Sequence, residues 1–192
     1  PHAGYRYSGP TAGVAYAALH GHRYTRVILL GPSHRAAFRG VAVPAATHFE
    51  TPLGPVPVDR TVIAELHKNP LFKEFDAAHA AEHSLEIQLP FLQRALGDQT
   101  FTIVPLVLGQ MDEEAVVAVA QALRPHLGAA GETLVLASTD FTHYGDNFQY
   151  TPFVDDVAAQ LRALDLGLFA HIEAADLPAM WRYKRETGIT AC

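Results

Sequence analysis

Imidazole, thiolate and carboxylate side chains, which bind transition metals in proteins, occur in this chain beside short apolar runs. The residues concerned are His2, His34, Asp140, His143 and Cys192. In an open α/β sheet, ligands bind beyond the carboxyl ends of the strands. If the apolar runs are such strands, the five side chains converge at one edge of the sheet, and the sequence predicts a metal or redox site there.

The spacing of these residues leaves a second interpretation open. None of them has the close spacing of a zinc finger or of the H-E-x-x-H helix. A histidine in a polar loop is often an ordinary surface residue, and a lone cysteine is often a small buried apolar side chain. On the residues alone, both the metal site and this plainer interpretation stand.

Short apolar runs bounded by turn residues predict the strands that must position the site. Residues 27–30, 101–108 and 133–137 form such runs, and residues 188–191 form a shorter one before Cys192. Continuous apolar runs are typical of strands that are buried on both faces.

Helix signals lie between these runs, which predicts an α/β fold with a mostly parallel, mixed central sheet and helices on both faces. Ser84 is the expected cap of one helix. Residues 41–59 hold four prolines and predict an antiparallel edge or a flap over the site. The predicted helices cover residues 11–20, a segment after Asp59 through Leu66, residues 84–96, a segment after Asp112 through Leu123, and a segment after Thr151-Pro152 through Leu168.

Composition excludes several classes of protein. With 192 residues, 49% of them hydrophobic, the chain can bury one core, and we expect a single domain over residues 1–192. The net charge of -6 argues against a nucleic-acid partner, because such binding rests on cationic contacts to phosphates. No apolar run approaches the roughly 20 residues that span a bilayer, so we expect no membrane partner. One cysteine excludes an internal disulfide and no signal-peptide pattern opens the chain, so we expect a cytoplasmic protein.

Other polar residues have less specific surroundings. Glu82 and His83 precede a predicted helix and belong either to the site or to an ordinary helix start. Ser33 and Ser138 follow apolar runs, but no G-x-S-x-G elbow supports a serine nucleophile. Nucleotide cofactors are not indicated, because the G-x-G-x-x-G and P-loop patterns are absent from the sequence. Several histidines at helix ends or in polar loops need no ligand: His20, His22, His67, His126 and His171.

Several sequence blocks resemble the Memo family, whose bacterial and archaeal members are called AmmeMemoRadiSam system protein B. The family usually extends beyond both ends of this chain, so the resemblance implies one Memo-like domain that is truncated at both ends. The blocks occur in the family's order and cover essentially the whole chain: Pro1-His2-Ala3-Gly4-Tyr5, Gly31-Pro32-Ser33-His34, Glu50-Thr51-Pro52-Leu53-Gly54, Glu82-His83-Ser84-Leu85-Glu86 and Thr139-Asp140-Phe141-Thr142-His143-Tyr144-Gly145.

The resemblance implies a fold similar to class III extradiol dioxygenases and a metal pocket. Position by position, it implies His2, His34 and Cys192 as metal ligands and Asp140 and His143 as residues that line the pocket. The implied cofactor is iron or copper, with zinc also possible. Dioxygenases hold Fe(II) with two histidines and a carboxylate, whereas a thiolate shifts the preference toward copper(I), zinc or thiolate-ligated iron.

Three functions stay open on the sequence, and so does the question of whether the protein is an enzyme. In an oxidoreductase or oxygenase-like enzyme, His143 would act as acid and base, and Asp140 would be a further ligand or orient a histidine. A second function is a partner of a radical-SAM enzyme and an AMMECR1-like protein in a modification pathway. The third is a module that binds a peptide or small molecule without turnover, with pocket aromatics among Tyr5, Tyr7, Phe49, Phe141 and Tyr144.

Overall fold

The computed structural model describes residues 1–128 and 132–192, and the chain divides into two compact units, residues 1–139 and residues 140–192. The expectation of a single domain stays a prediction, because each unit is described here on its own. Within the described ranges, none of the helices has both the length and the apolar character needed to traverse a bilayer.

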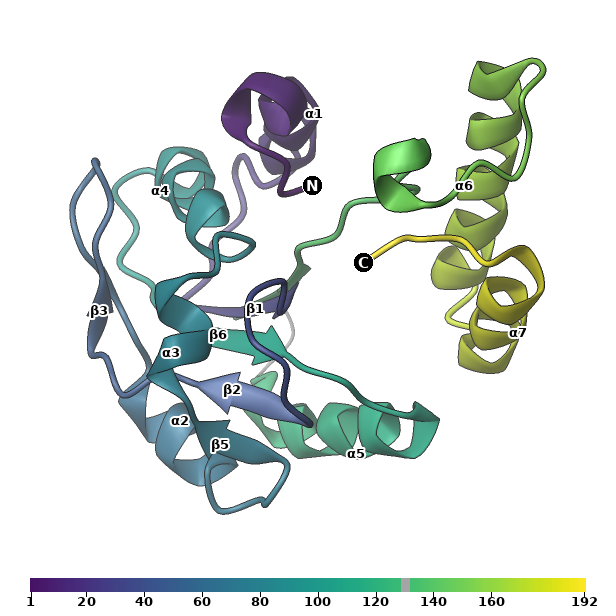
Figure 1. Cartoon of the computed structure of the whole chain (residues 1–192). Coiled ribbons are helices and arrows are strands. Elements are labelled where there is room, and N and C mark those ends of the chain that lie inside the picture. The colour runs from purple at the N-terminus through teal and green to yellow at the C-terminus, as the bar shows by residue number, and fades with distance from the viewer. Residues whose placement is uncertain (129–131) are drawn as a thin grey trace. The chain divides into compact units, whose positions relative to one another are not determined.

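The secondary structure alternates between strands and helices (Figure 1). The second unit contains η3 (Asp146–Phe148), α6 (Val157–Glu173) and α7 (Leu177–Thr187). The first unit contains α1 (Tyr5–Ala17), β1 (Arg26–Pro32), β2 (Val41–Val43), β3 (His48–Phe49), β4 (Val56–Pro57), α2 (Arg60–Leu66), β5 (Phe72–Glu74), α3 (Asp76–Ala80), η1 (Glu86–Gln88), α4 (Leu89–Leu96), β6 (Thr102–Leu108), α5 (Glu113–Leu123), η2 (Arg124–His126) and β7 (Thr133–Ala137).

A five-stranded sheet with the order β5-β2-β6-β1-β7 forms the centre of the first unit. Strand β1 pairs in parallel with β6 and with β7, and β2 pairs in parallel with β5, whereas β2 and β6 are antiparallel. The register aligns Leu29 of β1 with Pro105 of β6 and with Leu136 of β7. The predicted α/β class with a mixed, mostly parallel sheet is confirmed, and the topology is consistent with the class III extradiol dioxygenase-like fold.

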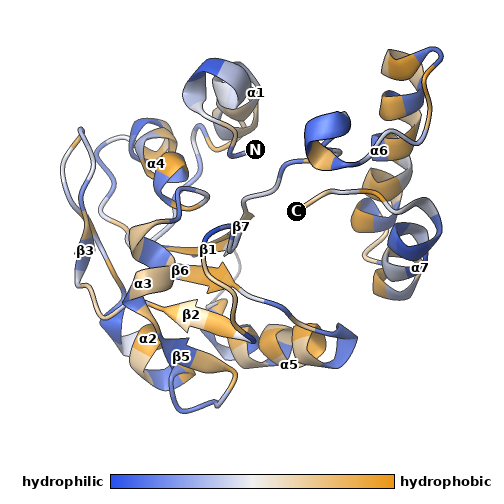
Figure 2. Ribbon diagram, in the orientation of Figure 1, coloured by the Kyte–Doolittle hydropathy of each residue, from blue (hydrophilic) through white to orange (hydrophobic). Residues whose placement is uncertain are grey.

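The central strands are apolar along most of their length because both faces of the sheet are covered. Strand β1 buries Val27, Ile28 and Leu29, and β6 buries every residue from Ile103 to Val107. In Figure 1, α4 lies on one side of the sheet and α5 on the other. Figure 2 shows the apolar strands in orange between helices that carry both apolar and polar residues.

The helices predicted after Asp59 and Asp112 are confirmed, and each of these residues caps its helix. The Asp59 side chain accepts a hydrogen bond from the Val62 N–H at the start of α2. Asp112 accepts one from the Ala115 N–H at the start of α5. Each carboxylate satisfies a backbone donor that has no partner within its own helix, and it lies at the positive end of the helix dipole.

Two predicted helix starts in the first unit are wrong, because tertiary contacts override the local signals. Helix α1 begins at Tyr5 and not near Thr11, since the Tyr5 ring packs against Phe91 of α4 with 5.6 Å between centroids. Ser84 does not cap a helix. Its hydroxyl donates to the Pro32 carbonyl oxygen at 3.1 Å, and α4 begins only at Leu89, after η1.

The second unit also departs from two expectations. Helix α6 begins at Val157 instead of after Thr151-Pro152, because the Tyr144 ring stacks on Phe153 and holds the preceding segment in irregular structure. Residues 188–191 form no strand. Helix α7 ends at Gly188 in the left-handed conformation, and the chain that follows is held by hydrogen bonds to residues 140–143.

Candidate metal centre

The tautomer of His2 is set by a buried hydrogen-bond network. Its Nδ1 atom lies 2.9 Å from the Ser138 hydroxyl oxygen. That hydroxyl donates its one hydrogen to the Ser84 carbonyl oxygen at 2.7 Å and accepts from Gln88 Nε2 at 2.9 Å. Because the hydroxyl has no second hydrogen to donate, His2 Nδ1 must carry a hydrogen and act as the donor. In the neutral ring, Nε2 is therefore the nitrogen of His2 that carries the lone pair.

Gln88 is fixed by its own partners, so the network around His2 has one orientation. The buried Tyr16 hydroxyl donates to Gln88 Oε1 at 2.8 Å, and Gln88 Nε2 also lies 3.0 Å from the Pro1 carbonyl oxygen. Burial raises the pKa of Tyr16, so this phenol stays protonated and keeps donating. The amide nitrogen of Gln88 thus points toward Ser138.

Glu82 fixes the position and the tautomer of His34 through hydrogen bonds to its backbone and ring. The Glu82 side chain is 1% exposed, and its Oε2 accepts the His34 backbone N–H at 2.6 Å. Its Oε1 lies 3.1 Å from His34 Nδ1 and accepts the backbone N–H groups of His83 and Ser84, each at 3.0 Å. An ionised carboxylate only accepts hydrogen bonds, so His34 carries a hydrogen on Nδ1, and in the neutral ring Nε2 is the nitrogen with the lone pair.

The hydrogen-bond donors around Glu82 stabilise its ionised form. Burial of the carboxyl group acts to raise its pKa, but the hydrogen bonds from the His34 backbone, the His34 ring and the Ser84 backbone outweigh it and lower the pKa to about 2. Glu82 is therefore ionised at neutral pH and holds a negative charge beside the candidate ligands.

Three imidazole rings face one another in the first unit. The ring centroids of His2 and His34 lie 5.1 Å apart, those of His34 and His83 lie 6.1 Å apart, and those of His2 and His83 lie 6.3 Å apart. Two imidazoles bound to one tetrahedral metal at about 2.0–2.1 Å have centroids about 5 Å apart. The pair formed by His2 and His34 has this spacing, so these residues fit a bound transition metal.

Two strand ends position the pair of histidines and their partners. His34 follows β1, and Ser138 follows β7, which lies parallel to β1. This is the edge of the sheet at which the sequence predicted the site. The structure thus brings His2 and His34 together.

The other predicted site residues, Asp140, His143 and Cys192, lie in the second unit. The His143 backbone N–H donates to Thr190 Oγ1 at 2.8 Å, and His143 Nδ1 donates to the Thr190 carbonyl oxygen at 3.0 Å. The Cys192 backbone N–H donates to the Asp140 carbonyl oxygen at 3.1 Å. The segment that carries Cys192 is therefore tied to the segment that carries Asp140 and His143. A ligand set that combines His2, His34 and Cys192 draws on both units and stays a prediction.

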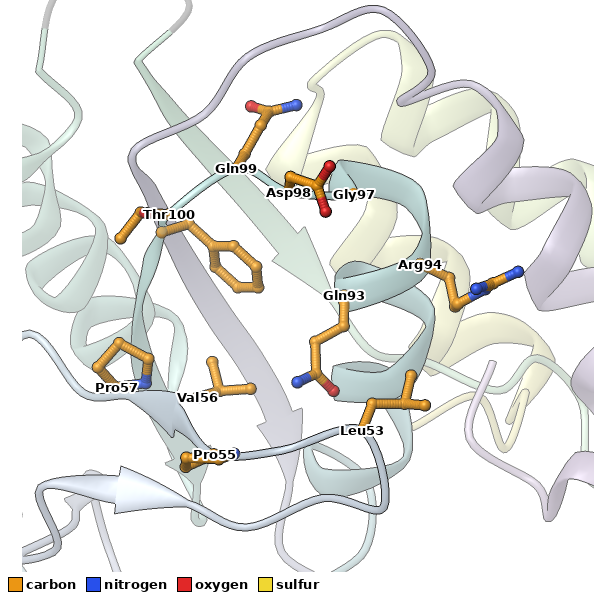
Figure 3. Close-up of a pocket in the computed structure, with 11 residues that line it drawn as sticks. Leu53, Pro55, Val56, Pro57, Gln93, Arg94, Gly97, Asp98, Gln99 and Thr100 are labelled. Carbon is orange, nitrogen blue, oxygen red and sulfur yellow. The ribbon is translucent and has the colours of Figure 1, made fainter.

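Two of the cavities in the described part of the first unit differ in how they relate to the site. One, of about 350 Å³, includes Glu82 in its lining together with Phe49, Glu50, Asp76 and His79. The other, of about 450 Å³, lies between the end of α4 and the β3–β4 hairpin (Figure 3). Gln93, Arg94 and Asp98 supply much of its polar lining, and no histidine or cysteine is among its described lining residues. The candidate metal chemistry therefore does not extend to this second cavity.

The sequence did not reveal the residues that orient the candidate metal-binding histidines through hydrogen bonds. Ser138 was considered only as a nucleophile, yet its hydroxyl is committed to Ser84, Gln88 and His2. Gln88 was not singled out, because nothing local marks a glutamine on a helical turn as a site residue. The block that contains Glu82 was the one available signal, and the structure brings Glu82 and His83 to His34.

The fold and the histidine cluster define the class: an α/β protein with a candidate transition-metal centre at the carboxyl edge of its sheet. The sequence matches the family model described as Memo-like protein over residues 1–192. The chain belongs to the Memo family.

Relatives from archaea and animals agree with this assignment. A MEMO1 family protein of Nitrosopumilus maritimus is 34% identical over 193 residues, which cover all of this chain and 66% of that protein. A MEMO1 family protein of Pyrococcus abyssi is 34% identical over 200 residues and is covered to 69%. The protein memo-1 homolog of Caenorhabditis elegans is 32% identical over 197 residues and is covered to 56%. The chain thus spans about two thirds of the length of these archaeal relatives and just over half of the nematode protein.

Proposed function

We propose that this chain is a metal-binding redox protein that holds iron or copper through His2, His34 and Cys192. The observation that carries the proposal is the pair of imidazoles with centroids 5.1 Å apart, each of which is held by a hydrogen bond at Nδ1. Membership of the Memo family, whose resemblance implies these three ligands, supports the choice of Cys192 as the third.

The donor set decides which metals suit the site. Imidazole suits iron, copper and zinc, and a thiolate moves the preference toward copper(I), zinc or thiolate-ligated iron. A bound iron or copper would supply one-electron and Lewis-acid chemistry at the site. The proposed third ligand is a thiolate and not a carboxylate. We therefore do not infer dioxygenase activity from the similarity in fold.

The residues of the second unit have proposed roles beside the metal. His143 would take up and release a proton through Nε2, because its Nδ1 hydrogen is committed to the Thr190 carbonyl oxygen. Asp140 would act as a further ligand or as an orienting carboxylate. The substrate of such a reaction is a small molecule or a peptide that the residues do not specify.

Elemental analysis of protein purified without chelator tests this proposal. We expect iron or copper in the purified chain, a loss of nearly all of it in His34→Ala, and a reduced content in Cys192→Ser, because each change removes a ligand. His67→Ala, which removes an exposed histidine at the end of α2, is the matched control and should keep the metal. Unchanged iron and copper contents in both ligand variants would show that the site is wrong.

A second candidate function is a binding module without turnover, and one observation favours it. Phe49 and Glu82 both line the cavity of about 350 Å³, which is large enough for a small ligand. Oxygen consumption with catechols and small reductants, measured on metal-loaded protein, separates the two functions. Turnover supports the redox protein, and its absence with iron, copper and zinc supports the binding module.

A further inference from the structure

His83 lies within the histidine cluster, and the proposed ligand set of His2, His34 and Cys192 does not use it. The candidate ligand atoms of His34, Glu82 and His83 all lie within 4.8 Å of one another. The His83 ring centroid lies 6.1 Å from that of His34 and 6.3 Å from that of His2. His2 is not part of that group, but its ring centroid lies 5.1 Å from that of His34, so three imidazoles from different segments of the chain are neighbours here.

The hydrogen bonds around Glu82 separate its role from that of the histidines. Its carboxylate accepts three backbone N–H groups, from His34, His83 and Ser84, as well as the His34 ring. Few lone pairs remain for a metal, so Glu82 is a positioning residue and not a ligand. Its Oε1 atom also lies 3.4 Å from His83 Nδ1. A hydrogen on that nitrogen leaves Nε2 as the ligating atom of His83, as in His34.

The His83 ring needs only a small movement to reach the spacing of imidazoles that share one metal. Imidazoles on one tetrahedral metal have centroids about 5 Å apart, so the His83 ring is roughly 1 Å too far from both partners. The His83 side chain is 54% exposed. Its ring can therefore turn toward the other two imidazoles without displacing core residues, while its backbone stays anchored to Glu82.

We propose that His83 is a third imidazole ligand of the metal centre, so that His2, His34 and His83 give the first unit a three-nitrogen site for a divalent transition metal such as Cu(II). This inference rests on the proposed function, in which His2 and His34 bind metal, and adds a ligand that does not depend on the thiolate.

Pulsed electron paramagnetic resonance on the Cu(II)-loaded full chain tests the proposal, because it counts coordinated imidazoles. Cys192→Ser serves as the background, since it prevents reduction of Cu(II) by the thiol. We expect three imidazoles in this background and two after His83→Ala or His83→Gln. Titration with Cu(II) should show at least the roughly 10-fold loss of affinity that even a change outside the ligand shell produces. His67→Ala in the same background should keep three imidazoles and the original affinity.

The outcomes separate this inference from the proposed function. An unchanged imidazole count and affinity in both His83 variants would overturn the third ligand, while a loss of binding in His34→Ala would still uphold the proposed site. An absence of stoichiometric binding of both Cu(II) and Fe(II) in the wild-type chain and in Cys192→Ser would overturn both. The two His83 variants must unfold at the same urea concentration as their background, which ensures that a changed count reports ligation.

Discussion

The chemistry of an imidazole depends on what holds its Nδ1 atom, and this chain commits that atom in His2, His34 and His143. His2 donates to Ser138, His34 to Glu82 and His143 to the Thr190 carbonyl oxygen. In each case the lone pair is on Nε2. The same tautomer suits a metal ligand and a group that takes up a proton, so the hydrogen-bond partners prepare these residues for either use.

The hydrogen bond between His2 and the Ser138 hydroxyl can be tested by a single substitution. We expect Ser138→Ala to weaken metal binding by about 10- to 100-fold, because His2 loses the acceptor that fixes its tautomer and ring orientation. Titration of the apoprotein with Cu(II) or Fe(II) measures the effect. Thr133→Ala, at the other end of β7, is the matched control. Equal affinities for Ser138→Ala and the wild-type chain would mean that the network does not position His2.

Glu82 makes stability depend on pH. Its pKa is about 2 in the folded chain, against 4.5 ordinarily. Between these values the unfolded chain binds a proton that the folded chain does not, so stability rises with pH and is lost as pH falls. We expect Glu82→Gln to lower the free energy of unfolding at pH 7 by about 3 kcal/mol.

Urea denaturation at several pH values measures this contribution. The gap in stability between the wild-type chain and Glu82→Gln should shrink as pH falls from about 5 toward 2. Glu65→Gln is the control, because Glu65 is exposed and its ion pair with Lys68 lies at the surface of the first unit, where such pairs contribute little. A gap that stayed constant across this range would contradict the assigned ionisation of Glu82.

At the residue scale, the sequence predicts which residues are candidate metal ligands, but it does not predict the residues that hydrogen-bond to them. His2 and His34 stand in recognisable blocks at the ends of apolar runs. Ser138 lies 136 positions from His2, and only the pairing of β1 with β7 brings its strand end to the site. A partner at such a separation leaves no periodic signal in the chain, so Ser138 and Gln88 could not be predicted as supports of the site.

At the element scale, the close approach of one loop to the end of β1 assembles the first half of the site. A Cβ atom at Gly31 would lie 2.6 Å from a Leu85 methyl carbon and 2.8 Å from the Ser84 hydroxyl oxygen. Only glycine lets the segment that carries Glu82 and His83 lie directly against the strand that leads to His34. The strand end and this segment therefore form a single structural unit.

Gly31→Ala tests that packing. We expect it to lower the free energy of unfolding by about 1–3 kcal/mol, because the methyl group forces Leu85 and Ser84 outward. Metal affinity should fall as well, since Glu82 moves with this segment. Gly13→Ala in α1, where an added Cβ meets no atom within 4 Å, should instead be neutral or stabilising. Urea denaturation of both variants decides the matter, and equal stabilities for them would contradict this role of Gly31.

Helices and strands whose sequence signals are local were predicted, and helix starts that depend on distant contacts were not. The strands β1, β6 and β7 were predicted from continuous apolar runs. In β1 and β6 these runs record burial on both faces, whereas β7 lies at the edge of the sheet and buries none of its residues, so the prediction of burial is wrong there. The helices that follow Asp59 and Asp112 were predicted, because the signal for such a helix start is local. The starts of α1, α4 and α6 were not, because contacts distant in sequence, such as that of Tyr5 with Phe91, decide them.

At the scale of the whole molecule, the chain divides into two units that each hold part of the predicted residue set. His2 and His34 are in the first, and Asp140, His143 and Cys192 are in the second. Family membership concerns both units, because the family model matches residues 1–192. The proposed site thus requires the thiolate of the second unit, whereas the proposed set of three imidazoles requires only the first.

The location of the bound metal tests the central claim most directly. Anomalous diffraction from crystals of the metal-loaded protein, measured at the iron, copper and zinc absorption edges, identifies the metal and its position together. We predict one anomalous peak at about 2.0–2.1 Å from Nε2 of both His2 and His34. A peak bonded to Nδ1 of either residue, a peak at another place in the chain, or loaded crystals with no peak beside these two histidines would contradict the account.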